Sequence, residues 1–170
     1  MISNIDDYLS GIGSAAVLGH INPDGDCVGS VTALYLYIKK YFSEINVKMF
    51  MDSFKDEFPH INVLSEVHHA DEPEFIPDVA FLLDTSSADR VGTAPDILKR
   101  AGRTVCIDHH VSNTGICDVN HIVPDASSAS EVLFDILPEE RIDKETAISI
   151  YTGIIHDSGV FQYKNTSKHT

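Results

Sequence analysis

Residues 15–30, AAVLGHINPDGDCVGS, decide the fold because they lead from a buried strand through a polar loop into a helix. The run 15–19 is apolar throughout, which is typical of a strand buried on both faces of a sheet. Residues 26–42 carry apolar side chains at helical spacing, at Val28, Val31, Leu34, Ile38 and Tyr41. The loop between them is rich in electron-pair donors, with His20, Asp24 and Asp26.

The middle of the chain repeats this alternation. Apolar runs at 45–51, 78–84 and 103–108 predict three further strands. The segment PDILKRAG, 95–102, predicts a helix that Gly102 closes. The rhythm of strands and helices predicts an α/β fold with a mainly parallel sheet and helices on both faces.

Two more helices are predicted toward the C-terminal end. The first lies within 127–137 and begins with a capping box formed by Ser128 and Glu131. The second covers 143–157, with Asp143 as its N-cap. Its inward side chains are expected to be Ala147, Ile150, Tyr151 and Ile154.

The composition limits the classes of function. The chain has 170 residues, 43% of them hydrophobic, so a globular domain with a core is expected. The 12 basic and 26 acidic residues give a net charge of −14, which argues against broad binding to nucleic-acid backbones. Three cysteines without a C-x-x-C pair predict no disulfide and a reducing, cytoplasmic location. The sequence has no signal-peptide pattern and no apolar run of ~20 residues, so neither a signal peptide nor a membrane span is predicted.

Polar side chains gather at the ends of the predicted elements. Asp84 ends one strand, the run 108–110 (Asp-His-His) ends another, and Asp157 ends the last helix. Ligands bind outside the carboxyl ends of the strands in an open parallel sheet. We therefore expect these side chains to converge with those of the 20–26 loop.

Each cluster alone has an ordinary structural explanation. Asp26 could cap the helix that it opens, Asp84 could be a turn residue, and Asp157 could belong to a helix exit. The combination of all the clusters in one chain favours a shared site. Within the loop, Gly25 is expected to bend the backbone between two carboxylates, and Gly29 to let the helix pack close to the sheet.

The donor types indicate divalent metal ions. Carboxylates and imidazoles suit Mn²⁺ first, then Mg²⁺ or Co²⁺, with Zn²⁺ also compatible. Four carboxylates in one pocket would repel one another, and two divalent ions would cancel their charge. The carboxylates in question are those of Asp24, Asp26, Asp84 and Asp157. The sequence therefore favours two ions over one.

The motifs resemble those of the DHH phosphoesterases. They are H-x-N-P-D-G-D-x-x-G-S at 20–30, Asp84 after a strand, D-H-H-x-S-N at 108–113, and Y-T-G-I-x-x-D-S-G-x-F-x-Y-x-N-T-S at 151–167. Within that family the chain is similar to the RecJ-like subgroup, which degrades very short RNAs and dephosphorylates 3′-phosphoadenosine 5′-phosphate. The resemblance implies a metal-dependent phosphoesterase that acts on short RNA or nucleotide phosphates.

The resemblance also implies which residues hold the two ions. His20 and Asp24 match ligands of the first ion, and Asp84 matches the carboxylate that bridges both. The ligands of the second ion match Asp26, His109 and Asp157. A water activated between the ions would attack the phosphorus.

Other residues are expected to act on the substrate. His110 matches the histidine that faces the substrate phosphate, and Asp108 is expected to support catalysis by orienting a ligand histidine. Ser112, Asn113 and Asn165 are predicted to contact phosphate or sugar.

The chain departs from the family pattern at its C-terminal end. Gln162 stands where an arginine is expected, and His156 stands where a small hydroxyl residue is more usual. Residues 161–164 predict a short strand and 165–167 a helix start. Residues 1–170 are expected to form one DHH domain without the C-terminal substrate-binding domain of the family.

Other functions fit parts of the pattern. A manganese inorganic pyrophosphatase shares the metal motifs, and a cyclic-dinucleotide phosphodiesterase shares the domain. A single-strand DNA exonuclease is a further alternative, but such enzymes are usually larger. A metal-binding interaction module is the non-enzymatic alternative, although no G-x-G-x-x-G or P-loop motif supports nucleotide binding of the usual kinds. A homodimer is a candidate assembly.

Overall fold

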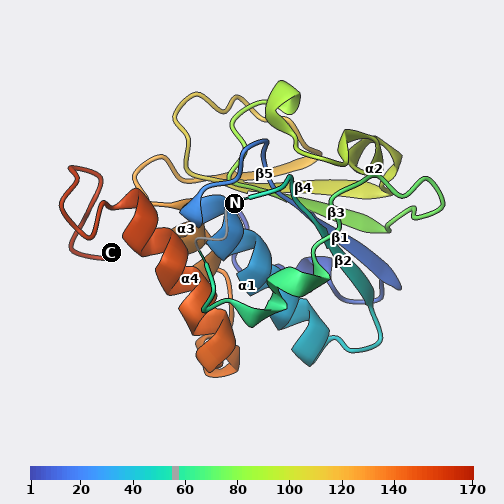
Figure 1. Ribbon diagram of the computed structural model, residues 1–170, viewed down its shortest axis with the longest axis horizontal. Coiled ribbons are helices and arrows are strands. Elements are labelled where there is room, and N and C mark those ends of the chain that lie inside the picture. Colours follow the sequence, from blue (N-terminus) through green and yellow to red (C-terminus); the bar gives the residue numbers. More distant parts are fainter. Residues whose placement is uncertain (55–57) are drawn as a thin grey trace.

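The sheet is parallel throughout. The computed structural model describes residues 1–54 and 58–170. In these residues five strands pair in the order β2-β1-β3-β4-β5 (Figure 1). Their bounds are Ser14–Leu18 (β1), Asn46–Phe50 (β2), Val79–Leu83 (β3), Arg103–Asp108 (β4) and Val119–Ile122 (β5). Each neighbouring pair is parallel, which confirms the predicted α/β class.

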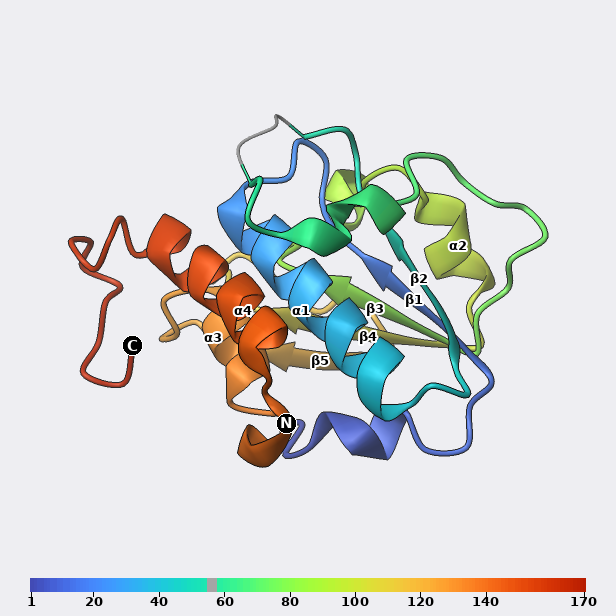
Figure 2. The same cartoon turned by 60° about the horizontal axis from the view of Figure 1, so that its bottom comes forward.

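Helices cover both faces of this sheet (Figures 1 and 2). One face carries α1 (Gly25–Tyr41), α3 (Ala129–Phe134) and α4 (Lys144–Asp157), and the other carries α2 (Pro95–Arg100). Short 3-10 turns connect the elements, at Ile5–Tyr8, Asn62–Glu66, Ala88–Arg90 and Glu139–Arg141. In the described part of the chain, no helix combines the length and apolar character that crossing a membrane requires.

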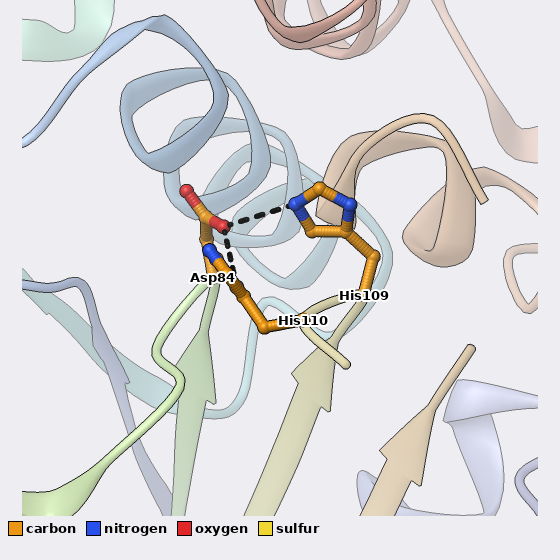
Figure 3. A group of neighbouring side chains, drawn as sticks. All are labelled: Asp84, His109 and His110. Carbon is orange, nitrogen blue, oxygen red and sulfur yellow. Dashed lines mark ion pairs between the residues drawn. The ribbon is translucent and has the colours of Figure 1, made fainter. Parts of the chain in front are cut away.

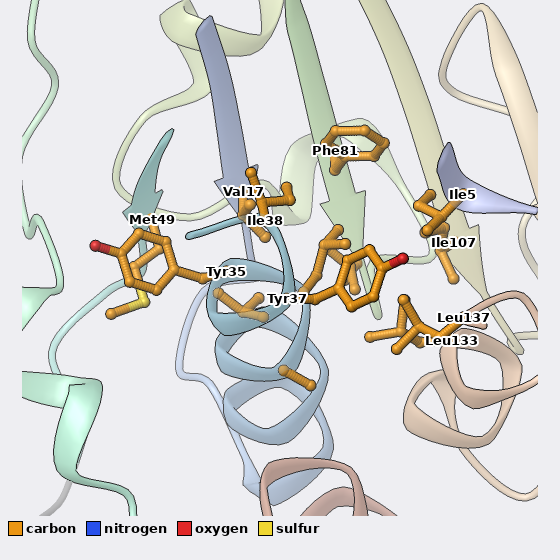
Figure 4. Close-up of a cluster of buried hydrophobic side chains, with 14 of the residues drawn as sticks. Ile5, Val17, Tyr35, Tyr37, Ile38, Met49, Phe81, Ile107, Leu133 and Leu137 are labelled. Atoms are coloured by element: carbon orange, nitrogen blue, oxygen red, sulfur yellow. The ribbon is translucent and has the colours of Figure 1, made fainter. Parts of the chain in front are cut away.

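The main core lies between the sheet and α1. Alternate strand residues face it, so that Val17, Phe81 and Ile107 meet side chains of the helices (Figure 4). Ile38 of α1 and Leu133 of α3 reach the same core and are fully buried. The intervening strand residues face α2 in a smaller cluster with Ile97.

Helices α1 and α4 pack very closely because two glycines meet. A Cβ atom on Gly29 would lie 2.6 Å from the carbonyl oxygen of Ser149 and 2.8 Å from the amide nitrogen of Gly153. Gly29 therefore permits close packing of α1 on α4, whereas we predicted close packing on the sheet. This contact sets the position of the C-terminal end of α4 relative to the start of α1.

Two predictions about the C-terminal part are wrong. Residues 161–164 form turns instead of a strand, and no helix begins at 165–167. The buried face of α4 is also rotated from the predicted one. Ile150 is buried as expected, but Ala147 is exposed and Tyr151 is 59% exposed. Thr146, Ser149 and Gly153 are buried in their place.

Candidate metal centre

The polar residues meet at the carboxyl edge of the sheet. Asp84 follows β3 directly, Asp108 is the last residue of β4, and His20 lies just beyond β1. The chain passes from β1 to β2 on one side of β1 and then from β2 to β3 on the other side, so the switch point of the sheet lies between β1 and β3. Such a point opens a crevice at the strand ends, which is the usual ligand site in this architecture.

A first group of donors surrounds the imidazole of His20. Its Nε2 atom lies 3.3 Å from Oδ2 of Asp84 and 3.8 Å from Oδ1 of Asp24. His20 and Asp84 are almost fully buried, while the side chain of Asp24 is 44% exposed. The donor atoms of the three residues lie within 4.8 Å of one another, close enough to hold one cation together.

A second group surrounds the imidazole of His109. Its Nε2 atom lies 3.2 Å from Oδ2 of Asp157 and 3.9 Å from Oδ2 of Asp26. Their donor atoms also lie within 4.8 Å of one another. The two groups bring together all the side chains that the sequence predicts as metal ligands.

Asp84 connects the two groups. Its Oδ2 atom faces His20, whereas Oδ1 lies 3.6 Å from Nε2 of His109 and 3.6 Å from Nδ1 of His110 (Figure 3). Both Oδ1 of Asp84 and Nε2 of His109 are buried and make no hydrogen bond with residues 1–54 or 58–170. Buried polar atoms normally have a partner, so this pair is arranged for an additional group.

The electrostatics of the centre favour a cation. Burial, together with the carboxylates of Asp84 and Asp157, raises the pKa of Asp26 well above its ordinary value. Burial opposes the charged form of His109, but its carboxylate neighbours Asp157 and Asp84 raise its pKa to about 11. The pKa of His20 is likewise raised by Asp24 and Asp84 against the effect of burial. All three shifts favour additional positive charge at the centre.

The carboxylate of Asp26 is fixed by the first residues of α3. Its Oδ2 atom accepts a hydrogen bond of 2.6 Å from the amide of Ala129, and Oδ1 accepts one of 3.0 Å from the amide of Ser130. No sequence pattern indicates that these two amides bind Asp26. The hydroxyl of Ser128 accepts a hydrogen bond from the amide of Glu131, as expected of the N-cap. The capping pattern in the sequence indicates where α3 begins, but not that its first amides contact Asp26.

Asp24, and not Asp26, is the N-cap of α1. Its Oδ1 atom accepts hydrogen bonds of 3.1 Å from the amides of Asp26 and Cys27. Although burial works in the opposite direction, His20 and the amide of Cys27 lower the pKa of Asp24 to about 2. A metal-ligand candidate therefore also begins the helix. Gly25 is the first helical residue, and a Cβ there would lie 2.5 Å from Cγ of His156.

Asp108 orients His110 rather than the predicted ligand histidine. Its Oδ1 atom lies 2.7 Å from Nδ1 of His110, and Oδ2 accepts a 2.7 Å hydrogen bond from the amide of Asn113. That amide also donates to the carbonyl of Thr85. Because Asn113 is buried and engaged in this way, its contacts favour support of Asp108 over contact with a substrate.

The remaining predicted residues lie around the centre. Ser112 is exposed just beyond His110. Asn165 donates hydrogen bonds of 2.9 Å to the carbonyl of Ser127 and 3.2 Å to that of Asp157, which ties the C-terminal segment to the centre. Gln162 is exposed. Nδ1 of His156 lies 3.8 Å from Oδ1 of Asp157.

The donor set fits divalent ions that prefer oxygen and imidazole. The carboxylates and histidines of the two groups supply such atoms, and no cysteine belongs to any candidate metal group in the described ranges. Cys27 is a neighbour of the centre, where its Sγ atom accepts a 3.3 Å hydrogen bond from the backbone amide of His20. Soft-metal thiolate chemistry has no support here.

Several known proteins are similar to this chain. The bifunctional oligoribonuclease and PAP phosphatase NrnA of Thermus thermophilus is 27% identical over 91% of the chain and 46% of its own length. The corresponding Bacillus subtilis protein is 24% identical over 89% of the chain and 48% of its length. The chain thus spans about half the length of the curated relatives that it matches.

A solved structure and a family model agree with these relatives. An exopolyphosphatase-related protein from Bacteroides fragilis has a TM-score of 0.85 and 24% identity over 96% of this chain and 52% of its own, which shows a shared fold. Residues 14–154 match the model of the DHH family, N-terminal domain. This match covers most of the chain, including every candidate metal ligand except Asp157, and the chain therefore belongs to the DHH family.

Proposed function

We propose that the chain is a metal-dependent phosphoesterase that hydrolyses short RNA oligonucleotides and 3′-phosphoadenosine 5′-phosphate. Membership of the DHH family supports phosphoester chemistry. The names of the relatives from Thermus thermophilus and Bacillus subtilis, oligoribonuclease and PAP phosphatase, support these substrates. Because the chain matches only about half of each relative, the activity of the whole proteins is a proposal for this one.

The arrangement of Asp84 carries the proposal. One carboxylate oxygen faces the His20 group and the other faces the His109 group, so a single side chain can serve two cations. His20, Asp24 and Asp84 would hold one ion, and Asp26, His109, Asp157 and Asp84 the other. When bound, two divalent ions, Mn²⁺ in the first place, supply Lewis-acid activation of water and of the phosphoryl group.

His110 is the residue that would act directly on the substrate. Its hydrogen bond to Asp108 raises its pKa, although burial acts in the opposite direction, which favours the protonated ring. Asp108 has a lowered pKa and is an acceptor only, because His110 and Asn113 outweigh burial. Nδ1 of His110 therefore keeps its proton for Asp108. Nε2 would donate to a phosphate oxygen or to the leaving oxygen.

The overall charge fits a small substrate better than a long one. A net charge of −14 repels extended phosphate backbones beyond the range of the centre, whereas bound cations neutralise one or two phosphates locally. Mononucleotides and dinucleotides satisfy this condition. The proposal therefore excludes long RNA as the preferred substrate.

The test compares Asp84→Asn with the unchanged chain. Phosphate or nucleotide release is measured in Mn²⁺ with 3′-phosphoadenosine 5′-phosphate, a di-ribonucleotide, pyrophosphate and a cyclic dinucleotide. The unchanged chain should turn over the first two, and Asp84→Asn should lower kcat at least about a hundredfold by removing the shared ligand, a loss typical of one missing charge-stabilising contact.

Asp125→Asn is the matched control, because Asp125 is an exposed aspartate that belongs to no candidate metal group. It should keep full activity. If the unchanged chain hydrolyses pyrophosphate or the cyclic dinucleotide faster than the first two compounds, the proposed substrates are wrong. Absence of turnover on all substrates, with metal still bound, would favour a metal-binding interaction module.

A further inference from the structure

A hollow adjoins the candidate metal centre on the side of Asp24. It has a volume of about 490 Å³, within the ~300–1,000 Å³ range of small-molecule sites. Asp24 and His156 line it, and both also have donor atoms within 4.8 Å of the carboxylate of Asp157. Asp24 therefore belongs both to the candidate metal centre and to the wall of the hollow, so the two sites adjoin one another.

Aromatic rings form a large part of the wall. Phe54 and Phe58 line the hollow, and both pack against the main core from a partly buried position. The ring of Phe54 lies 5.9 Å from that of His69, centroid to centroid, and the ring of Phe58 lies 6.4 Å from that of His60. The two phenylalanine rings are thus supported from outside the hollow.

The imidazole of His156 packs directly against the backbone of Gly25. Any Cβ at position 25 would lie 2.5 Å from Cγ of His156, so the ring occupies the space that another residue would fill. The side chain of His156 remains 48% exposed. It stands between the Asp157 carboxylate and the hollow, where a planar ring can touch a ligand that reaches from one to the other.

The charge of the hollow decides which part of a ligand it suits. Its lining residues within the described ranges include no lysine or arginine, and the carboxylate of Asp24 lies at its edge. A neutral planar ring suits this wall, because it can stack on the aromatic side chains. Asn22 and Ser53 add polar groups that can bond to the edge of such a ring.

We propose that this hollow is a nucleobase subsite, in which Phe54, Phe58 and His156 hold the base of a nucleotide whose phosphate lies at the metal centre. The proposal rests on the proposed function and names the part of the substrate that the chain itself recognises. Stacking is tolerant of base identity, so the subsite selects nucleotides over other phosphoesters without selecting a sequence.

The test uses two substrates that differ only in the base. One is 3′-phosphoadenosine 5′-phosphate, and the other is the same sugar bisphosphate without a base. Phe54→Leu and His156→Ser should each lower the ratio of kcat/KM between the nucleotide and the base-free compound at least about fivefold, because each removes a ring on which the base stacks. The loss should fall mainly on KM for the nucleotide.

A second readout does not depend on turnover. The chain has no tryptophan, so the fluorescence of a 2-aminopurine nucleotide can be followed without interference. Binding to the unchanged chain should quench this fluorescence by stacking, and Phe54→Leu should raise the apparent Kd at least about fivefold. Phe54→Tyr keeps the ring and should restore binding, which separates loss of stacking from loss of folding.

Phe134→Leu is the matched control, because Phe134 is a 39% exposed aromatic residue on α3 that does not line the hollow. It should change neither readout. An unchanged kcat/KM ratio and an unchanged Kd in both Phe54→Leu and His156→Ser would overturn the subsite while leaving the phosphoesterase intact. If the unchanged chain hydrolyses neither compound, the proposed function itself fails.

Discussion

Gly153 shows how a residue without a side chain shapes the centre. It packs where α4 meets both α1 and α3, and a Cβ there would lie 2.6 Å from Oδ1 of Asp26 and would overlap the hydroxyl of Ser130. The carboxylate of Asp26 keeps its two amide hydrogen bonds only because this space is empty. At the scale of residues, small side chains therefore control the geometry of the acidic ones.

Gly153→Ala should lower the free energy of unfolding by ~1–3 kcal/mol, the range found for overpacked interiors. It should also weaken Mn²⁺ binding, because Asp26 must move. Urea unfolding and metal titration measure the two effects. Gly13→Ala is the control, since its Cβ would meet only Oδ2 of Asp78 at an ordinary 3.6 Å. Equal effects of the two substitutions would contradict this account.

Helix α4 shows what sequence patterns can and cannot predict at the scale of elements. Its extent and its cap at Asp143 follow from local signals, and the structure confirms both. Its buried face does not follow, because close packing on α1 through Gly29 selects Ser149 and Gly153 over the larger Tyr151. The periodicity of apolar residues indicates where hydrophobic side chains lie, but it does not indicate where glycines bring two helices into contact.

Strand β5 (Val119–Ile122) was not predicted for a related reason. Its sequence, VNHI, is short and half polar, so it lacks the apolar run that marks β1, β3 and β4. Tertiary pairing with β4 holds it in place. In the candidate centre, by contrast, His20, Asp84 and His109 converge because they follow strand ends, where the parallel sheet sets their position. Asp26 in α1 and Asp157 at the end of α4 join them through helix packing. The amides that fix Asp26 depend on the packing of α3 and could not be predicted.

His121 of β5 should make stability depend on pH. Its Nδ1 atom accepts a 2.9 Å hydrogen bond from the amide of Ile2, which requires the neutral ring. Burial, together with the charged N-terminus, lowers its pKa. The unfolded chain therefore binds a proton first, and the stability contribution is complete above about pH 6.5 and lost as pH falls through the folded pKa.

His121→Asn keeps an acceptor near Ile2 but does not titrate. The difference in unfolding free energy between the unchanged chain and this variant should shrink between pH 7.5 and pH 5.5. Urea unfolding in EDTA measures it, with His60→Asn at an exposed histidine as the control. A difference that stays constant over this interval would disprove the coupling.

The whole molecule is destabilised by its own centre when no cation balances it. Burial and neighbouring carboxylates act against the ionised form of Asp26, and the total charge is −14. An ion that binds only the folded chain raises the free energy of unfolding by about 2.7 kcal/mol when its free concentration is a hundred times its Kd. For a chain of 170 residues this corresponds to a rise in Tm of ~5–10 °C per ion.

Thermal melting with increasing Mn²⁺ measures this rise. It should saturate, reverse with EDTA, and be much smaller in Asp84→Asn, which lacks a full carboxylate between the two groups. Asp125→Asn should behave like the unchanged chain. A Tm that does not respond to Mn²⁺ would contradict the assignment of the centre as a metal site.

Asp84 has a left-handed backbone conformation, which residues other than glycine adopt uncommonly, aspartate more often than most. Its φ is 51°, in the left-handed region, which costs ~1–2 kcal/mol for a residue with a Cβ and nothing comparable for glycine. Selection for thermostability in the absence of metal should therefore enrich Asp84→Gly, which would relax the backbone and remove a buried negative charge. The enriched chains would melt higher in EDTA and no longer respond to Mn²⁺. At this edge of the sheet, folding stability is lower because a carboxylate is held among the imidazoles of His20, His109 and His110.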